Sequence, residues 1–235
     1  AMSGAAPPPR PRRSLGAVPP PAPSTPAQRP VFYLLAGPNG AGKSTLYKAL
    51  AANGTLAPPG LEFVNADLHE AAHLQHISDP QARSEAARAW AEERRAALLA
   101  DRQSFVSETV FSHPSKLALI DEAQAAGFLV VLIVVALDDP QKLLERVRRR
   151  VGEGGHAVPD ERVLARYPRT LALLAQAVRK VPVALLYDSE VVEPGTHRLV
   201  PLCRHGVTQA PLRALPAWAA TLLGAASESS VPPLP

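Results

Sequence analysis

A glycine-rich loop between a strand-like and a helix-like segment constrains the fold of this chain more than any other feature. Residues 37–44 read GPNGAGKS, which matches the Gly-x-x-x-x-Gly-Lys-Ser pattern of phosphate-binding loops. The apolar run 31–36 before it has the length of a buried strand, and residues 44–52 after it contain no Pro or Gly and are typical of a helix. In that context the loop N–H groups and the helix N-terminus bind phosphate oxygens. The sequence therefore predicts a nucleoside triphosphate site rather than a glycine-rich turn with a solvated lysine.

Each residue of the loop has an expected role. The Lys43 ammonium would reach the β- and γ-phosphates of ATP, and the Ser44 hydroxyl would bind the Mg²⁺ that bridges them. The residues that we expect to contact the nucleotide are Gly37, Pro38, Asn39, Gly40, Ala41, Gly42, Lys43, Ser44 and Thr45.

Composition divides the chain into one domain and two tails. We expect a Pro-rich low-complexity tail at 1–30, a domain at 31–224 and a flexible tail at 225–235. The net charge of +4 with only 5% aromatic residues argues against a nucleic-acid groove and favours small anionic ligands. The longest apolar run, 128–137, is too short to span a bilayer, and the lone Cys203 excludes an internal disulfide. Together with an N-terminus that lacks the apolar centre of a secretory signal, these features lead us to expect a cytoplasmic protein without a membrane partner.

From residue 31 onward, strand and helix signals alternate, which predicts an α/β fold with a mostly parallel central sheet and helices on both faces. Ligands then bind at the carboxyl ends of the strands. We expect strands at 31–36, 61–64, 104–107, 129–137 and 183–187, with an edge strand at 197–202. We expect helices at 43–52, 67–76, 80–101, 115–126, 140–151, 160–179 and 211–223.

Two acidic residues directly follow predicted strands and so should face the phosphate loop. Asp67, in the run Asn65-Ala66-Asp67, can act as the base for an acceptor hydroxyl, or it can cap the helix that follows. Glu108 can order Mg²⁺-bound water or bind substrate hydroxyls, with Thr109 and Ser112 as hydrogen-bonding neighbours, or it can be a surface carboxylate. The sequence alone leaves both pairs of alternatives open.

Arginines gather in the second half of the chain. One predicted helix carries Arg146, Arg148, Arg149 and Arg150, the next carries Arg162, Arg166 and Arg169, and Gly154, Gly155 and His156 lie between the two helices. Within each helix, several of these arginines share a face at i,i+4 or i,i+7 spacing. Two such faces around a Gly-Gly hinge predict a lid that closes over a transferred phosphoryl group, although a solvated helix face is the alternative for most single arginines.

A second motif points to different chemistry. Residues 69–73 read HEAAH, the His-Glu-x-x-His pattern of zinc proteases, and His76 adds a third imidazole. The pattern fixes only three positions, and it lies where the acceptor of the phosphate loop should bind. We therefore expect incidental metal binding at most, without proteolysis.

Taken together, these residues resemble the zeta toxin family of P-loop kinases. The resemblance rests on GPNGAGKST at 37–45, VNAD at 64–67, FVSETVFSHPSKLALIDEAQAAGF at 105–128 and, most specifically, LLERVRRRVGEGGHAVPDERVLARYPRTL at 143–171, which is typical of the Gram-negative-type branch. The resemblance implies an ATP- and Mg²⁺-dependent kinase of the 3′-hydroxyl of the amino sugar in UDP-N-acetylglucosamine, a bacterial wall precursor.

The same resemblance assigns roles to individual residues. It implies Asp67 as the base, Lys43 and Ser44 on ATP and Mg²⁺, and Glu108 with Thr109 in the sugar-nucleotide pocket that Asn65 and Ser112 also line. Arg150 and Arg166 would close on the γ-phosphate, with Arg148 and Arg169 as the alternatives.

Some features fall outside this pattern. The late strand ends in Asp188-Ser189 without the Asn that often lies between such residues in the family, which puts a nucleotide contact there in doubt. Any neutralising antitoxin would have to be a separate protein, because the Pro-rich N-terminus does not resemble the helical element that neutralises some members. The competing hypotheses are a P-loop kinase for another hydroxyl acceptor, such as an antibiotic, a nucleoside or a nucleic-acid end, and a regulatory ATP-binding protein without catalysis.

Overall fold

The computed structural model describes residues 29–54, 60–153, 157–190, 197–209 and 215–224. The expected tail at 225–235 and all but the last two residues of the expected tail at 1–30 lie outside these ranges. So do Gly154, Gly155 and His156 of the expected hinge.

The described strands form one mixed sheet in the order β2-β3-β1-β4-β5-β6-β7. β2, β3, β1, β4 and β5 are parallel to one another, while β6 and β7 continue the sheet antiparallel at one edge. The α/β prediction is confirmed, with the phosphate-loop strand β1 between β3 and β4. The strand bounds are Val31–Ala36 (β1), Glu62–Val64 (β2), Phe105–Thr109 (β3), Leu129–Ala136 (β4), Val183–Asp188 (β5), Arg198–Arg204 (β6) and Val207–Gln209 (β7).

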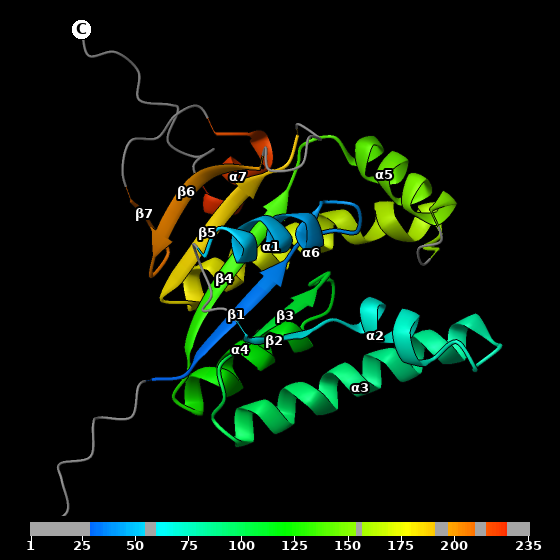
Figure 1. The fold of residues 1–235 in the computed structure, drawn as a ribbon. Coiled ribbons are helices and arrows are strands. Elements are labelled where there is room, and N and C mark those ends of the chain that lie inside the picture. The colour runs from blue at the N-terminus through cyan, green and yellow to red at the C-terminus, as the bar shows by residue number, and fades with distance from the viewer. Residues whose placement is uncertain (1–28, 55–59, 154–156, 191–196, 210–214, 225–235) are drawn as a thin grey trace, which may run out of the picture.

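Helices cover both faces of the sheet (Figure 1). One apolar cluster joins the sheet to α3, α4, α6 and α7, and a second joins its other face to α1 and α5. The helix bounds are Lys43–Ala52 (α1), Ala66–His73 (α2), Pro80–Ala100 (α3), Ser115–Ala125 (α4), Pro140–Gly152 (α5), Asp160–Lys180 (α6) and Ala217–Leu223 (α7).

Strand β4 shows how the sequence builds this three-layer arrangement. Val130, Leu132 and Val134 belong to the first cluster and Val131 and Ile133 to the second, because successive strand side chains point to opposite faces. Both faces are buried, which explains why the strand is apolar without alternation.

Most predicted bounds lie within two residues of the observed ones. β3 continues through Thr109, so Glu108 is the penultimate strand residue rather than the first residue of a loop. α2 ends at His73, three residues earlier than expected. α7 begins at Ala217, and residues 211–214 of the helix expected at 211–223 lie outside the described ranges. The short β7 was not predicted. In the described residues, no helix is long and apolar enough to cross a membrane.

Candidate functional site

The phosphate loop is packed tightly against its neighbours, which requires its glycines. A Cβ atom on Gly37 would lie 2.0 Å from the carbonyl oxygen of Val135 in β4, and one on Gly40 would lie 2.5 Å from that of Leu143 in α5. Gly40 also has a φ of +80°, a conformation that glycine adopts without steric cost. The backbone of β4 and α5 therefore forms the wall that shapes the loop.

Lys43 lies inside the loop, as the motif predicts. Its side chain is only 6% exposed, and Nζ donates hydrogen bonds to the carbonyl oxygens of Gly37 (2.9 Å) and Pro38 (3.1 Å). Burial lowers the pKa of this ammonium, and the charges of Glu108 and Asp67 offset part of the shift. A desolvated cation held by neutral carbonyls gains strongly from an approaching phosphate.

Glu108 joins three parts of the site. Its Oε2 accepts hydrogen bonds from the Ser44 hydroxyl (2.8 Å) and from Asn65 Nδ2 (2.9 Å), and its Oε1 lies 3.7 Å from Lys43 Nζ. The Glu108 side chain is only 15% exposed. The alternative interpretation of Glu108 as a surface carboxylate is therefore wrong. The Ser44 hydroxyl and this carboxylate are oxygen donors of the kind that Mg²⁺ prefers.

The structure separates the roles of Asn65 and Asp67. Asn65 precedes α2, and its Oδ1 accepts a hydrogen bond from the backbone N–H of Leu68 (3.1 Å), so Asn65 is the N-cap. The interpretation of Asp67 as a capping residue is therefore wrong. Asp67 lies in the first turn of α2, is 52% exposed, and forms an ion pair with Arg150 of α5, with 3.7 Å between Oδ2 and Nη1. Its carboxylate does not cap the helix, and it lines a cavity.

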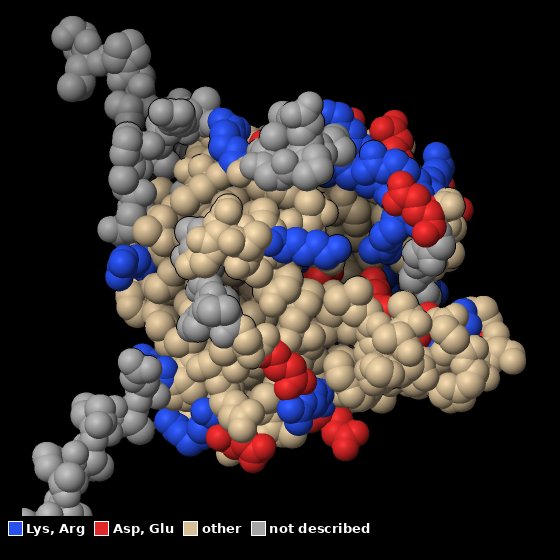
Figure 2. All heavy atoms as spheres, in the orientation of Figure 1, with Lys and Arg blue, Asp and Glu red and all other residues tan. Residues whose placement is uncertain are grey.

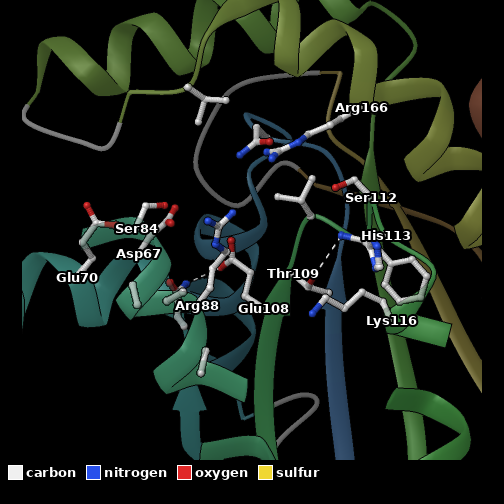
Figure 3. Close-up of a pocket in the computed structure, with 18 of the residues that line it drawn as sticks. Asp67, Glu70, Ser84, Arg88, Glu108, Thr109, Ser112, His113, Lys116 and Arg166 are labelled. Atoms are coloured by element: carbon white, nitrogen blue, oxygen red, sulfur yellow. Dashed lines mark hydrogen bonds between the residues drawn. The ribbon is translucent and has the colours of Figure 1, made fainter. Parts of the chain in front are cut away.

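That cavity, of about 710 Å³, lies between the α2–α3 hairpin, the carboxyl end of β3 with the loop after it, and α5 with α6. Figure 3 shows Asp67 and Glu108 facing this space from α2 and β3, with Arg166 of α6 on another side. Residues far apart in the sequence, all predicted for the site, meet on its lining: Asn39, Lys43, Asn65, Asp67, Glu108, Thr109, Ser112, Arg150 and Arg166.

A smaller hollow of about 240 Å³ adjoins the cavity. It contains Gly40, Gly42, Ser44, Thr45, Arg146, Arg149 and His197 among its lining residues. Lys43, Glu108 and Arg150 line both spaces. These shared side chains mark the boundary between a compartment over the phosphate loop and one beside Asp67.

A tight turn after β3 brings hydroxyl groups to the cavity. Thr109 Oγ1 accepts a hydrogen bond from the N–H of Phe111 (3.1 Å). The Phe111 side chain is buried, and its backbone has a φ of +60°. Thr170 of α6 holds the same turn by donating to the carbonyl oxygen of Val110 (3.2 Å). Ser112 then lines the cavity.

The arginines divide by position. Figure 2 shows basic side chains gathered around α5. Arg150, Arg162, Arg166 and Arg169 line the cavity, whereas Arg148 is exposed and paired with Asp160 at the start of α6. Arg146 donates to the carbonyl oxygen of Ser189 (2.7 Å), so it fastens α5 to the end of β5.

Arg166 has an electrostatic environment that suits an anion. Burial lowers the pKa of its guanidinium, and the neighbouring charges of Arg162, Arg88 and Arg169 lower it further. Four arginines that repel one another around a cavity are stabilised when an anion enters.

The zinc-protease pattern does not form a zinc site. The His69 ring stacks on Trp90 with centroids 3.7 Å apart, and Glu70 is buried in an ion pair with Arg83 of α3, with 3.1 Å between Oε1 and Nε. His76 lies beyond the end of α2. Within the described ranges, no three His, Cys, Asp or Glu side chains are placed to hold a metal ion.

Glu70 accordingly has a structural role that stability measurements will detect. Glu70→Gln is expected to lower the free energy of unfolding by about 1.5–3 kcal/mol, because it removes the charge from a mostly buried charge-assisted hydrogen bond between α2 and α3. Urea denaturation measures the change, with the exposed Glu93→Gln as control. If Glu70 had a hydrolytic role, Glu70→Gln would instead abolish peptide hydrolysis and leave the free energy of unfolding unchanged.

Sequence reasoning missed Arg88, Arg95 and Lys116, which line the cavity from α3 and α4. No motif marks the two arginines, and only their seven-residue spacing, two helical turns on one face, gives a signal. Lys116 lies within the family-like run 105–128, but that run gave it no predicted role. The last residue of β5, Asp188, has a structural contact. Asp188 accepts a hydrogen bond from Trp218 Nε1 (3.1 Å) and so holds α7.

Comparisons with known proteins agree with this architecture. The family model described as Zeta toxin matches residues 21–191. A chain of the PezAT chromosomal toxin-antitoxin system of Streptococcus pneumoniae is 13% identical with a TM-score of 0.57, and the match covers 75% of this chain and 72% of that one. A search of curated proteins finds no significant match.

A second solved structure, the AvrRxo1-ORF1:-ORF2 complex with ATP, gives 17% identity and a TM-score of 0.57. The match covers 77% of this chain but 60% of the other, so this chain spans less than two thirds of that neighbour. These structural likenesses show a shared fold. The family match extends from before β1 to the end of β5 and includes the phosphate loop, Asp67, Glu108 and the arginine-bearing helices, so the chain belongs to the Zeta toxin family.

Proposed function

We propose that the protein is an ATP-dependent kinase that phosphorylates the 3′-hydroxyl of the amino sugar in UDP-N-acetylglucosamine or a related UDP-sugar. The observation that carries the proposal is the meeting of two compartments at Lys43, Glu108 and Arg150. One compartment lies over a phosphate-binding loop. The other contains the carboxylate of Asp67. A γ-phosphate at this boundary would be within reach of an acceptor on the far side.

On the donor side, the loop N–H groups and Lys43 would bind the phosphates, while Ser44 and Glu108 would hold Mg²⁺ through their oxygens. The residues fit this ion, because a hydroxyl and a carboxylate already lie 2.8 Å apart at the loop. Bound Mg²⁺ neutralises charge on the β- and γ-phosphates. Lys43 exchanges its contacts with the carbonyl oxygens of Gly37 and Pro38 for phosphate oxygens.

On the acceptor side, Asp67 accepts the proton of the acceptor hydroxyl as its oxygen bonds to the γ-phosphorus of ATP and the bond from that phosphorus to ADP breaks, so that ADP leaves. Arg150 forms an ion pair with Asp67 and, with Arg166, stabilises the equatorial oxygens of the transferring phosphoryl group. The base and a phosphate-binding arginine are thus already adjacent.

The choice of a UDP-sugar rests on the family and on the cavity. A volume of about 710 Å³ accommodates a ligand larger than a single sugar, and its basic lining suits an acceptor with phosphates. A kinase for an uncharged acceptor would have less use for these cations. The Streptococcus pneumoniae neighbour belongs to a toxin-antitoxin system, which supports a separate antitoxin protein as a partner of this chain.

The test is direct. Incubation with ATP, Mg²⁺ and UDP-N-acetylglucosamine is expected to give a product heavier by one phosphate, which mass spectrometry detects and phosphorus NMR assigns to the sugar. Lack of product across a panel of UDP-sugars, with turnover of another alcohol, would replace the sugar by that acceptor. ATP affinity without product from any acceptor would favour the regulatory alternative.

A further inference from the structure

The lining of the cavity includes a buried arginine that has few hydrogen-bond partners among the described residues. Arg95 of α3 is 6% exposed, and its Nη1 donates to the Ser107 hydroxyl at 3.4 Å, close to the longest distance for such a bond. A guanidinium has five N–H donors, and burial lowers the pKa of this one. The described residues around Arg95 therefore leave most of its hydrogen-bonding capacity for something in the cavity.

A second cation lies beside it. Lys116 of α4 also lines the cavity, and its pKa is lowered by burial and then by the charge of Arg95, while Glu92 acts in the opposite direction. The carboxylate of Glu92 lies 3.8 Å from Lys116 Nζ but is itself 67% exposed, so solvent screens it. Two mutually repelling cations thus share one weak counter-charge at a partly buried surface.

We infer that Arg95 and Lys116 form a second anion subsite, which binds the diphosphate of the acceptor and selects nucleotide-linked sugars over free ones. The inference rests on the proposed function, since the acceptor must occupy this cavity. Figure 3 shows Asp67 and Lys116 on opposite sides of Glu108, so an acceptor anchored at Lys116 extends across the cavity toward the base. Anchoring at a distance from the reacting hydroxyl orients it for transfer.

Binding to the protein with its donor site saturated by a non-hydrolysable ATP analogue and Mg²⁺ tests this subsite apart from the phosphate loop. Calorimetry with UDP-N-acetylglucosamine, UDP, inorganic pyrophosphate and N-acetylglucosamine is expected to show binding of the first three and little of the last. Lys116→Ala should weaken the three phosphate-bearing probes by about 10- to 100-fold, the usual effect of losing a charge-assisted hydrogen bond. Arg95→Lys, which keeps a cation but loses the planar donor set, should weaken them by a smaller factor.

Arg94→Gln is the matched control. Arg94 neighbours Arg95 on α3 but pairs with Glu62 outside the cavity, with both nitrogen–oxygen distances at 2.6 Å. This variant should bind all probes as the wild type does. Circular dichroism and thermal melting identify any variant that loses its fold, and Lys116→Ala carries the test if Arg95→Lys does so.

The outcomes separate this inference from the proposed function. Phosphorylation of UDP-N-acetylglucosamine with unchanged binding in Lys116→Ala and Arg95→Lys would overturn the subsite and leave the kinase intact. Binding of pyrophosphate that depends on Lys116, without turnover of any UDP-sugar, would support the subsite and refute the proposed acceptor.

Discussion

Replacing Asp67 by Asn is expected to lower the kcat of phosphoryl transfer by at least about 100-fold, because a positioned general base contributes that much or more. The amide keeps the size of the side chain but does not accept the proton of the acceptor hydroxyl. ATP binding should persist, since Lys43 and the loop glycines are unchanged. The rate is measured with saturating ATP and acceptor, and ATP affinity by calorimetry.

A stability measurement makes this prediction specific. The Asp67–Arg150 pair joins two side chains that are roughly half exposed, so its loss should change the free energy of unfolding by less than about 1 kcal/mol. Glu93→Gln, an exposed change on α3, is the control. A variant with wild-type kcat would show that Asp67 is not the base, and one that has lost ATP binding would place it on the donor side.

Replacing Arg166 by Ala is expected to reduce kcat by about 1,000-fold or more, the effect of removing an arginine that neutralises a transferring phosphoryl group. The same change should leave the melting temperature of the ligand-free protein unchanged or raise it. The reason is that burial, and then the charges of Arg162, Arg88 and Arg169, lower the pKa of Arg166, so its charged form is disfavoured at this position. Loss of activity would thus accompany equal or greater stability.

Arg148→Ala provides the comparison on the neighbouring helix. Arg148 is exposed and pairs with Asp160 away from the cavity, so its removal should leave kcat within about twofold of wild type, as expected for a surface ion pair. An equal loss of kcat in Arg148→Ala and Arg166→Ala would mean that α5 and α6 act as a unit. A lower melting temperature for Arg166→Ala would show that Arg166 stabilises the fold instead.

The sequence predicted the parts of the site whose position follows from the strand or loop that they adjoin in the chain. A glycine-rich loop after a strand and acidic residues at strand ends occupy the same edge of a parallel sheet wherever such a sheet forms. Asp67 and Glu108 were found in this way, and the structure brings both to one cavity. The choice between Asn65 and Asp67 as the cap was not predictable, because it depends on α2 beginning at Ala66.

The parts that depend on packing between helices were not predicted. α3 carries several arginines that look equivalent in the sequence, yet Arg83 and Arg94 pair with carboxylates while Arg88 and Arg95 line the cavity. Which face of α3 points inward is decided by how the α2–α3 hairpin docks on the sheet. Likewise, a shift of two positions along α5 separates Arg148 on the surface from Arg150 at the cavity.

The contact between Gly40 and the backbone of Leu143 has a consequence for genetics. Leu143, Leu144 and Val147 anchor α5 in the core, and the main chain of the same helix forms the wall of the phosphate loop. A small-to-large or large-to-small change at these buried positions displaces that wall by a fraction of an ångström before it unfolds the protein. In a random mutagenesis screen such alleles would be scored as defects in nucleotide affinity, although none of the altered side chains touches a nucleotide.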